Sequence, residues 1–591
     1  MGNRRMSVGF MLIAACILAI FGNRSASEDI RAYLINQPDE TQESRDYVFE
    51  HAAVAASQLE CSVVGTDIMQ AGGNAVDAAI ATTMCEGVVE PYHTSIGGGA
   101  TMLIYNSTTK SVTSILSKEK APADATPNMY IGDANPSRGV KSIGVPGQLR
   151  GLEYAYNKYG GRVSWAALLQ PSIDKARNGF KVSGQLSIAL TSLYENVIVH
   201  DTNSVFCDIY CNEDRTGVKQ KGDIVINLLL ADTLIKIQQH GVEGFYTGDM
   251  ADITINEFRA QGGIMTKKDL MDFDVIEEAA IPIQLPNAGY TMHTAPLPMG
   301  GSILGATLSI MDLFDISPQD YDNSAALQWH RTIEAFRHSF GVRYEMGDPD
   351  MYPESQDVED QIVSGEYAKS AIEKIHDDET SPDPAYYGAT YLTYPKETFT
   401  THVSVIDQNK IGVAITSTIS SLWGSYFMSP TTGIVYNNVM SVFSYPTGDP
   451  DHDSKLVPSN QIEGGKRARS TMSPAIFLDE NSSPAFIVGS AGGVRIPTSI
   501  AQVMLRILYF GTDFSIESSI NKRRLHDSLS SSGAFEYEDR FDPDIVEELK
   551  RIGHKSKIMT SKARVNAIQL KNSQIHAFSD MRNEGAGPSG W

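Results

Sequence analysis

A Thr-Thr-His sequence, Thr400 to His402, stands directly in front of an alternating apolar stretch that is typical of a β-strand. A threonine hydroxyl is a weak nucleophile unless a base lies beside it. If the Phe399–Thr400 bond is cut, the new α-amine of Thr400 supplies that base, because an α-amine has a pKa of about 7.7–8.0. The pattern therefore allows acyl transfer by an N-terminal threonine, although the same residues also suit an ordinary strand start.

Two later stretches contain groups that acyl transfer needs. Along "AITSTIS", four side chains share one strand face: Ala414, Thr416, Thr418 and Ser420. We expect this polar row on the strand that neighbours the one beginning at Thr400. Further on, "GSAGG" ends a strand with Gly492 and Gly493, whose backbone amides could closely approach an oxyanion.

Length and charge limit the class of protein. The chain has 591 residues and is 42% hydrophobic, which supports a large core in one or several domains. Its formal charge of −23 repels phosphate groups, so nucleic acid is excluded as a partner.

The N-terminal residues predict secretion. Arg4 and Arg5 precede an uncharged stretch from Ser7 to Phe21, and small residues follow at 25–27. This pattern predicts a signal peptide at 1–27 that is cleaved, with an uncleaved membrane anchor as the alternative.

Four cysteines remain once Cys16 is removed with the signal peptide: Cys61, Cys85, Cys207 and Cys211. An even number in a secreted chain favours two disulfide bonds, and no histidine pair lies at ligand spacing near them, so we expect no metal. Asn106 and Asn481 each begin a glycosylation sequon.

Periodicity predicts layered helices and strands. Helical patterns cover two segments within 58–89, then 164–178, 322–346, 498–510 and 543–552. Five strand-like segments fill the C-terminal third: "THVSVID", "IGVAITSTIS", "GIVYNN", "PAIFLDE" and "PAFIVGSAGG". We interpret His330 and His338 as ordinary helix residues and expect sheets enclosed between helices.

With these residues in place, the chain from about 45 to 591 resembles the γ-glutamyltranspeptidases, also called glutathione hydrolases. Ordered matching blocks run along nearly the whole chain: "GTDIMQAGGNAVDAAIATTMC", "SIGGG", "GVPG", "PSIDKARNGF", "FYTG", "HRTIEAFR", "TTHVSV", "ITSTI", "GIVYNN", "STMSP" and "GSAGG". The resemblance implies an α+β fold of the N-terminal-nucleophile hydrolase type, a four-layer αββα sandwich.

The resemblance also implies residue roles. A proenzyme would cut itself before Thr400 into a large fragment, 28–399, and a small one, 400–591, which remain together as a heterodimer. Thr400 would be the nucleophile and Thr418 its positioning hydroxyl. The other implied roles are an oxyanion hole at Gly492 and Gly493, a carboxylate-binding hydroxyl pair at Ser470 and Thr471, and disulfides that join Cys61 to Cys85 and Cys207 to Cys211. No cofactor is needed, because amine, hydroxyls and amides suffice for acyl transfer.

The sequence departs from the family pattern where the substrate would bind. Lys118 replaces the arginine that grips the glutamyl carboxylate, and Ser420 replaces an asparagine. Val439 and Val442 occupy the positions that would neutralise the substrate's α-ammonium, and Ser441 replaces an aspartate between them. Each broken buried charge pair costs on the order of 2–5 kcal/mol, so γ-glutamyl binding should be weakened.

Three functions are compatible with this combination. The first is a secreted γ-glutamyl transferase or hydrolase, acting for example on glutathione, with weakened substrate binding. The second is an acylase whose apolar pocket includes Val439 and Val442. The third is a processed but inactive pseudoenzyme that acts as an extracellular factor, since members of the family are recruited into animal secretions such as venoms.

Overall fold

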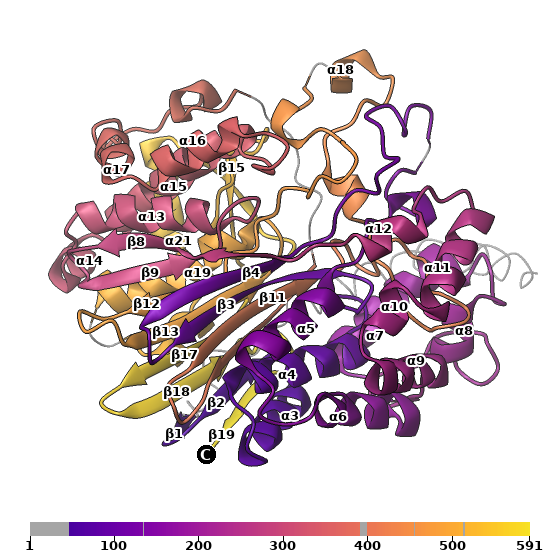
Figure 1. Ribbon diagram of the computed structural model, residues 1–591. Coiled ribbons are helices and arrows are strands. Elements are labelled where there is room, and N and C mark those ends of the chain that lie inside the picture. The colour runs from indigo at the N-terminus through magenta and orange to yellow at the C-terminus, as the bar shows by residue number, and fades with distance from the viewer. Residues whose placement is uncertain (1–46, 134, 391–398, 454, 512–513) are drawn as a thin grey trace, which may run out of the picture.

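The computed structural model describes residues 47–133, 135–390, 399–453, 455–511 and 514–591 (Figure 1). The signal peptide predicted at 1–27 therefore lies outside the described residues. Among the helices that are described, none has the length and apolar character needed to cross a membrane.

Two seven-stranded antiparallel sheets form the centre of the molecule. The first sheet has the order β19 (Gly587–Gly590), β2 (Ala53–Ala56), β10 (Thr401–Ile406), β11 (Gly412–Thr418), β3 (Gly99–Asn106), β4 (Ser111–Ser117) and β7 (Ile276–Ala279). The second has the order β1 (Val48–Phe49), β18 (Gln574–Ser579), β17 (Arg564–Lys571), β13 (Pro484–Ala491), β12 (Ala475–Leu478), β9 (Tyr290–Thr294) and β8 (Ile281–Leu285).

The sheets pack face to face, with β10 and β11 against β13. Helices cover the outer face of the first sheet: α3 (Leu59–Gln70), α4 (Ala75–Val89), α5 (Gln148–Tyr159) and, behind them, α6 (Trp165–Asn178) and α9 (Leu228–His240). The second sheet is covered by α13 (Gly301–Leu313) and α19 (Arg495–Leu505), with α15 (Ala325–Gly341) and α21 (Pro543–Ile552) beyond. This is the four-layer αββα order expected from the sequence.

The smaller elements decorate these layers. Two further sheets pair β5 (Phe180–Lys181) with β6 (Ile224–Val225) and join β14 (Leu525–His526), β15 (Ala534–Tyr537) and β16 (Lys555–Ile558). The remaining helices include α7 (Gly184–Leu193), α8 (Val205–Tyr210), α10 (Glu243–Tyr246), α11 (Asp249–Ala260), α12 (Lys267–Met271), α14 (Pro318–Asn323), α16 (Glu354–Ile362), α17 (Gly365–Ile372), α18 (Pro450–Asp453) and α20 (Ile516–Asn521).

Most of the predicted elements form where the periodicity placed them, but "GIVYNN" at 433–438 does not become a strand. It makes isolated bridges only, Met428 with Val435 and Gly97 with Tyr436. Within this segment, the side-chain amide of Asn437 donates to the carbonyl oxygens of Gly97 and Gly144. The segment therefore links loops instead of joining a sheet.

Both disulfide bonds implied by the resemblance are present. Cys61–Cys85 joins α3 to α4, and Cys207–Cys211 closes a short loop at the end of α8. The first fixes the helix pair that lies against β2 and β10.

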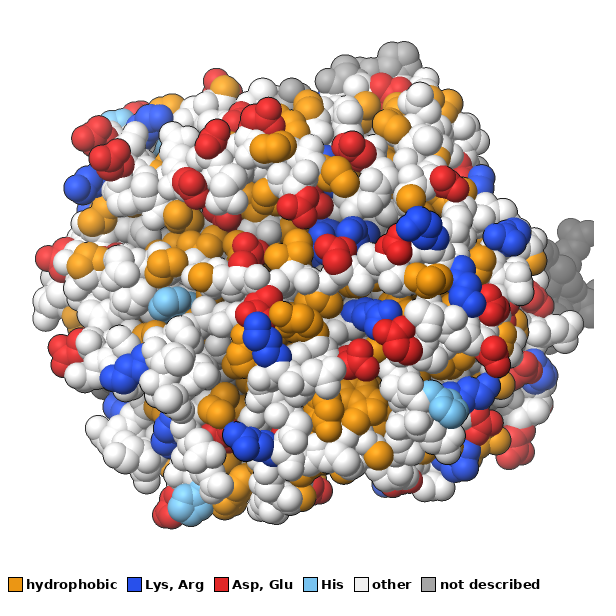
Figure 2. Space-filling view, in the orientation of Figure 1, with side chains coloured by type: hydrophobic (Ala, Val, Ile, Leu, Met, Phe, Trp, Pro, Cys, Tyr) orange, Lys and Arg blue, Asp and Glu red, His pale blue; other side chains and the backbone are white. Residues whose placement is uncertain are grey.

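The surface shown in Figure 2 has acidic and basic side chains interspersed, with no extended basic area on that face. The sequons lie at one end of the sheets, where Lys110 donates to the carbonyl oxygen of Asn481 and the Asn106 side chain accepts hydrogen bonds from the turn that follows it. Their glycosylation stays a prediction.

A substitution between the two sheets tests their packing. A Cβ added to Gly489 of β13 would lie 2.2 Å from Cε1 of His402 on β10. Gly489→Ala should lower the free energy of unfolding by about 1–3 kcal/mol through overpacking, as measured by denaturant titration. The control is Gly365→Ala in α17, where the added Cβ meets nothing within 4 Å. Equal unfolding midpoints for the two variants would contradict this packing.

Candidate functional site

Alternation along β10 separates the functional side chains onto two faces. Thr401 points to the helical layer, where its hydroxyl donates to Glu86 of α4 at 2.6 Å. His402 points between the sheets, bonding Thr416 at 2.8 Å and Ser404 at 3.0 Å. Thr400 is one residue before Thr401, so its side chain belongs to the face between the sheets.

The Phe399–Thr400 bond, which the sequence predicts to be cut, is contacted by residues at the end of β11. The Thr418 hydroxyl donates to the carbonyl oxygen of Phe399 at 2.6 Å, and Thr418 Oγ1 accepts from the Ser420 amide at 2.8 Å. The Phe399 amide donates to the Ser420 carbonyl at 3.2 Å. Thr400 is 1% exposed, and its hydroxyl has no hydrogen-bond partner among the described residues. The hydroxyl is thus adjacent to a polarised carbonyl and is not held elsewhere.

His402 acts as a structural group in this arrangement. Its ring is fully buried, and burial lowers its pKa to about 3. The ring is therefore neutral at physiological pH and bridges β10, β11 and, through Ser404, the Asn566 carbonyl of the second sheet. The Thr-Thr-His motif thus contains one candidate nucleophile, one anchor to the helices and one contact between the sheets.

Gly492 and Gly493 lie immediately after β13, on the sheet that faces Thr400. Their φ angles of 136° and 58° favour glycine. Neither main-chain amide donates a hydrogen bond within the described part of the chain. Two free amides at the end of a facing strand are suited to an oxyanion, although among the described residues they make no hydrogen bond to Thr400.

The "SIGGG" segment leads into β3 and lies between the end of β11 and the residues that follow β4. Cβ atoms at Gly98 and Gly99 would lie 2.2 Å from the Thr418 carbonyl oxygen and 2.7 Å from Glu119 Oε2. Lys118 donates to Glu119 at 2.6 Å, and both side chains are fully buried. The cation predicted to meet a substrate carboxylate therefore already has a carboxylate beside it.

The other departures from the family pattern are Ser420, two residues after the end of β11, and the segment 439–442. Ser420 is buried with φ 77°, and its hydroxyl has no partner among the residues described. Val439 is 0% exposed and packs against Gly144, whereas Val442 is partly buried at the edge of the same apolar cluster. Ser441 turns back to the Asn438 carbonyl at 2.8 Å.

Ser470 and Thr471 are buried, and their segment packs alongside the loop that leads into α13. The Ser470 amide donates to the Pro298 carbonyl at 2.8 Å, and a Cβ at Gly300 would lie 2.7 Å from the Thr471 backbone. The structure does not show these hydroxyls in contact with Thr400, so their role toward a substrate stays a prediction.

Sequence reasoning missed the acidic groups behind β10. Glu86 and Glu90 are buried in and just after α4, and neither was selected from the sequence. The available signal was two carboxylates within a helix of small and apolar residues, where an isolated charge is costly.

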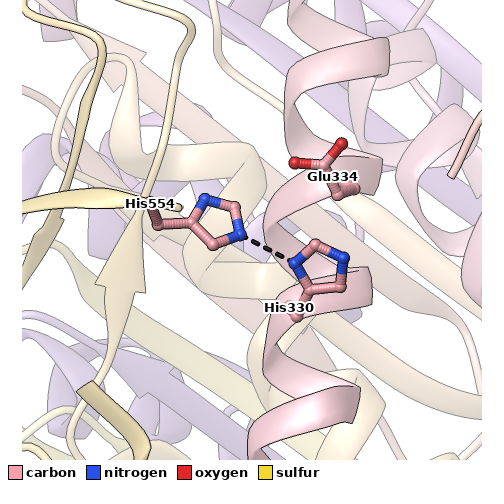
Figure 3. Close-up of side chains that lie close together, drawn as sticks. All are labelled: His330, Glu334 and His554. Carbon is pink, nitrogen blue, oxygen red and sulfur yellow. Dashed lines mark hydrogen bonds between the residues drawn. The ribbon is translucent and has the colours of Figure 1, made fainter. Parts of the chain in front are cut away.

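One compact cluster of potential metal ligands lies elsewhere, between α15 and the segment after α21 (Figure 3). His330 Nδ1 lies 2.7 Å from His554 Nε2, and His330 Nε2 lies 2.7 Å from the His376 carbonyl. Glu334 accepts from Tyr387 at 2.9 Å. Both ring nitrogens of His330 are therefore engaged, which fits the interpretation of this residue as part of the helix packing.

The layers and the site together define a class of protein. Two antiparallel sheets between helical layers, with a threonine at the start of a central strand, form the N-terminal-nucleophile hydrolase fold. The cephalosporin acylase from Bacillus halodurans shares it, with a TM-score of 0.80 and 25% identity, covering 94% of this chain and 99% of that chain.

Within this class, the sequence model described as gamma-glutamyltranspeptidase matches residues 61–589, and the chain belongs to this family. Glutathione hydrolase 2 from Arabidopsis thaliana is 35% identical over 564 residues, which cover 92% of this chain and 94% of that protein. Scoloptoxin SSD14 from Scolopendra dehaani is 34% identical over 515 residues, covering 86% of this chain and 87% of that protein.

The neutral state of His402 predicts an acid limit to stability. Because the unfolded chain binds a proton below pH 6.5 and the folded ring does not, the contribution of His402 is lost as pH falls toward about 3. Replacing His402 with Gln should reduce the dependence of unfolding free energy on pH between 6 and 4 by about 1.4 kcal/mol per pH unit. Denaturant titrations across this range measure it. The exposed His51→Gln serves as control; an unchanged slope in His402→Gln would refute the assignment.

Proposed function

We propose that this protein is a secreted precursor that cuts its own chain before Thr400 and then transfers or hydrolyses γ-glutamyl groups. The observation that carries the proposal is the 2.6 Å hydrogen bond from the Thr418 hydroxyl to the Phe399 carbonyl oxygen. A donor aimed at the carbonyl of the bond to be cut stabilises the negative charge that develops on its oxygen.

The cut requires only groups of the chain and one water. Thr400 Oγ attacks the Phe399 carbonyl carbon, and the acyl group moves from the Thr400 nitrogen to its oxygen as the peptide C–N bond breaks. The nitrogen takes up the hydroxyl proton and becomes a free amine. Water then hydrolyses the ester, which leaves a carboxylate on Phe399 and a free hydroxyl on Thr400.

Acyl transfer to a second substrate repeats this chemistry. The new α-amine accepts the proton of the Thr400 hydroxyl as that oxygen attacks a γ-glutamyl carbonyl. The amides of Gly492 and Gly493 are suited to the tetrahedral oxyanion, and water or an amine then releases the glutamyl group. The name of the plant relative, glutathione hydrolase, supports glutathione as a substrate of the same type.

The substrate end of the site supports weakened binding. The charge of Lys118 is already matched by Glu119, and lysine lacks the planar two-pronged geometry of arginine. Val442 offers an apolar surface where the ammonium group would need a carboxylate. Affinity for a zwitterionic substrate should therefore be lower than in a site that has both the arginine and the carboxylate of the family pattern.

A second candidate is a processed extracellular factor without enzymatic activity. Val439 is packed at 0% exposure in an apolar cluster, which favours a site that no longer receives an ammonium group. The similarity to a protein named scoloptoxin also supports this reading. An acylase of altered specificity, with Val439 and Val442 in its pocket, is the third reading.

Self-cleavage is tested by three variants. Wild type should yield a small fragment whose first residues are Thr-Thr-His, as read by N-terminal sequencing of the smaller band on a reducing gel. Thr400→Ala should stay one chain. Thr418→Val, which keeps the shape but loses the donor, should slow cleavage about a hundredfold, whereas Thr418→Ser should retain most of the rate. An intact wild-type chain would contradict the proposal.

Substrate use is tested with a γ-glutamyl anilide. If the proposed activity is present, wild type should release the chromophore slowly but faster than Thr400→Ala. The combined change Lys118→Arg, Ser420→Asn and Val442→Asp should raise kcat/KM at least tenfold by restoring two charge contacts. Val439 is left unchanged because a charge there would be buried among apolar residues.

Two results would redirect the assignment. Release no faster than from Thr400→Ala, with activity only in the restored variant, would favour the inactive factor. Faster cleavage of N-acyl amides that lack an α-amine would favour the acylase.

A further inference from the structure

Two carboxyl groups lie buried directly behind the start of β10. Glu86 is in α4 and Glu90 caps its C-terminal end, one helical turn later, and both are 0% exposed. Within the described residues, the only basic side chain within 4 Å of either carboxyl is His93, whose Nδ1 lies 3.7 Å from Glu90 Oε2. Buried carboxyls without a lysine or arginine are costly, so their arrangement calls for a role.

Glu86 holds the residue that follows Thr400. Its Oε2 accepts from the Thr401 hydroxyl at 2.6 Å, and its Oε1 accepts from the Ser57 amide at 2.7 Å. The Thr401 and Ser57 hydroxyls also lie 2.8 Å apart. Thr401 is thereby fixed toward the helices, and strand alternation directs Thr400 to the opposite face.

Glu90 lies beside His93, which packs on the other side of the same bond. Its Oε1 accepts from Gln58 at 2.6 Å and from Asn583 at 3.3 Å. The His93 ring lies 5.4 Å from the Phe399 ring, centroid to centroid, and its carbonyl accepts from the Ile419 amide at 3.2 Å. The two carboxyls therefore contact groups that flank Thr400 on both sides.

Resting on the proposed self-cleavage, we propose that Glu86 and Glu90 are positioning residues for the cutting of the Phe399–Thr400 bond. Glu86 holds Thr401 directly, and Glu90 lies beside His93, whose ring packs against Phe399, so that the Thr400 hydroxyl faces the carbonyl it attacks. Neither carboxyl touches the reacting atoms.

The charge state of the pair gives this role a measurable signature. Burial, and then the charge of Glu90, raise the pKa of Glu86 to about 8. Burial also acts to raise the pKa of Glu90, but His93, Gln58 and Asn583 outweigh it and the net direction is downward. Glu90 thus carries one negative charge at neutral pH, while Glu86 keeps its proton until the pH passes about 8.

The surrounding groups leave this charge state intact. Among the residues that the structure describes, Glu90 is the one charged group acting on Glu86. Burial lowers the pKa of His93, and the positive charge of Arg564 on β17 acts in the same direction. Tyr92 donates to Glu90 at 3.1 Å, and the remaining contacts come from uncharged amides and hydroxyls. A second negative charge would repel Glu90 and would also oppose the charge that develops on the Phe399 carbonyl oxygen.

The experiment follows cleavage of full-length chain made by cell-free synthesis, after synthesis is stopped and the pH is set between 6.5 and 9.5. Gel quantification of the small fragment gives the rate. Glu86→Leu, which removes the acceptor for Thr401, should be at least tenfold slower than wild type at pH 7. Glu86→Gln keeps an acceptor and cannot ionise, so it should match wild type at pH 7 and exceed it about thirtyfold at pH 9.5.

The matched control is Glu359→Gln in α16, another buried carboxyl whose pKa burial raises to about 7 and which accepts from the Leu297 amide at 3.4 Å. It should follow the wild-type pH profile. Circular dichroism of each variant in the Thr400→Ala background reports folding; if Glu86→Leu is unfolded, the Glu86→Gln to wild-type ratio decides.

Two outcomes would overturn the inference and are distinguishable. A ratio of Glu86→Gln to wild type that is constant with pH, while wild type is cut normally, removes this role and leaves the proposed function standing. A folded wild type that is never cut at any pH removes both.

Discussion

The pairing of β10 with β2 and β11 is the constraint on which the rest of the site depends. The register opposes Thr401 to Ser417 and His402 to Thr416, so each residue of the Thr-Thr-His motif faces a fixed side. A shift by one residue would turn Thr400 toward α4 and bring Thr401 between the sheets. The helices on one side and the second sheet on the other therefore both specify where the hydroxyl of Thr400 lies.

The proposed reaction end and the proposed recognition end of the site differ in how closely their residues match the family pattern. The hydroxyl of Thr418 and the amides of Gly492 and Gly493 need only backbone geometry and one side chain, which the sheets supply. Recognition of a zwitterion needs paired charges at defined distances, and here Val439 is packed in an apolar cluster. The two ends can thus change independently, because different loops build them.

Local patterns in the sequence predicted much of this structure. Helix α4, strands β10 to β13 and the polar face of β11 follow from periodicity and turn residues, and the disulfide pairing followed from the family resemblance. The prediction of a strand at 433–438 was wrong, because the Asn437 side chain donates to the carbonyls of Gly97 and Gly144 in loops distant in the sequence. The pairing of β10 with β2 and the contact of Glu86 with Thr401 join residues hundreds of positions apart, and no local pattern encodes such contacts.

The location of Thr400 has a consequence for the end that a cut would create. Chain termini usually fray, because nothing compensates for the entropy lost when they are ordered. Here the new end would arise already immobilised next to a central strand, with neighbours on both sides and layers above and below. Folding of the uncut chain would have met that entropic cost beforehand, whereas a separately made polypeptide beginning at Thr400 would have to find its place between strands that are already paired.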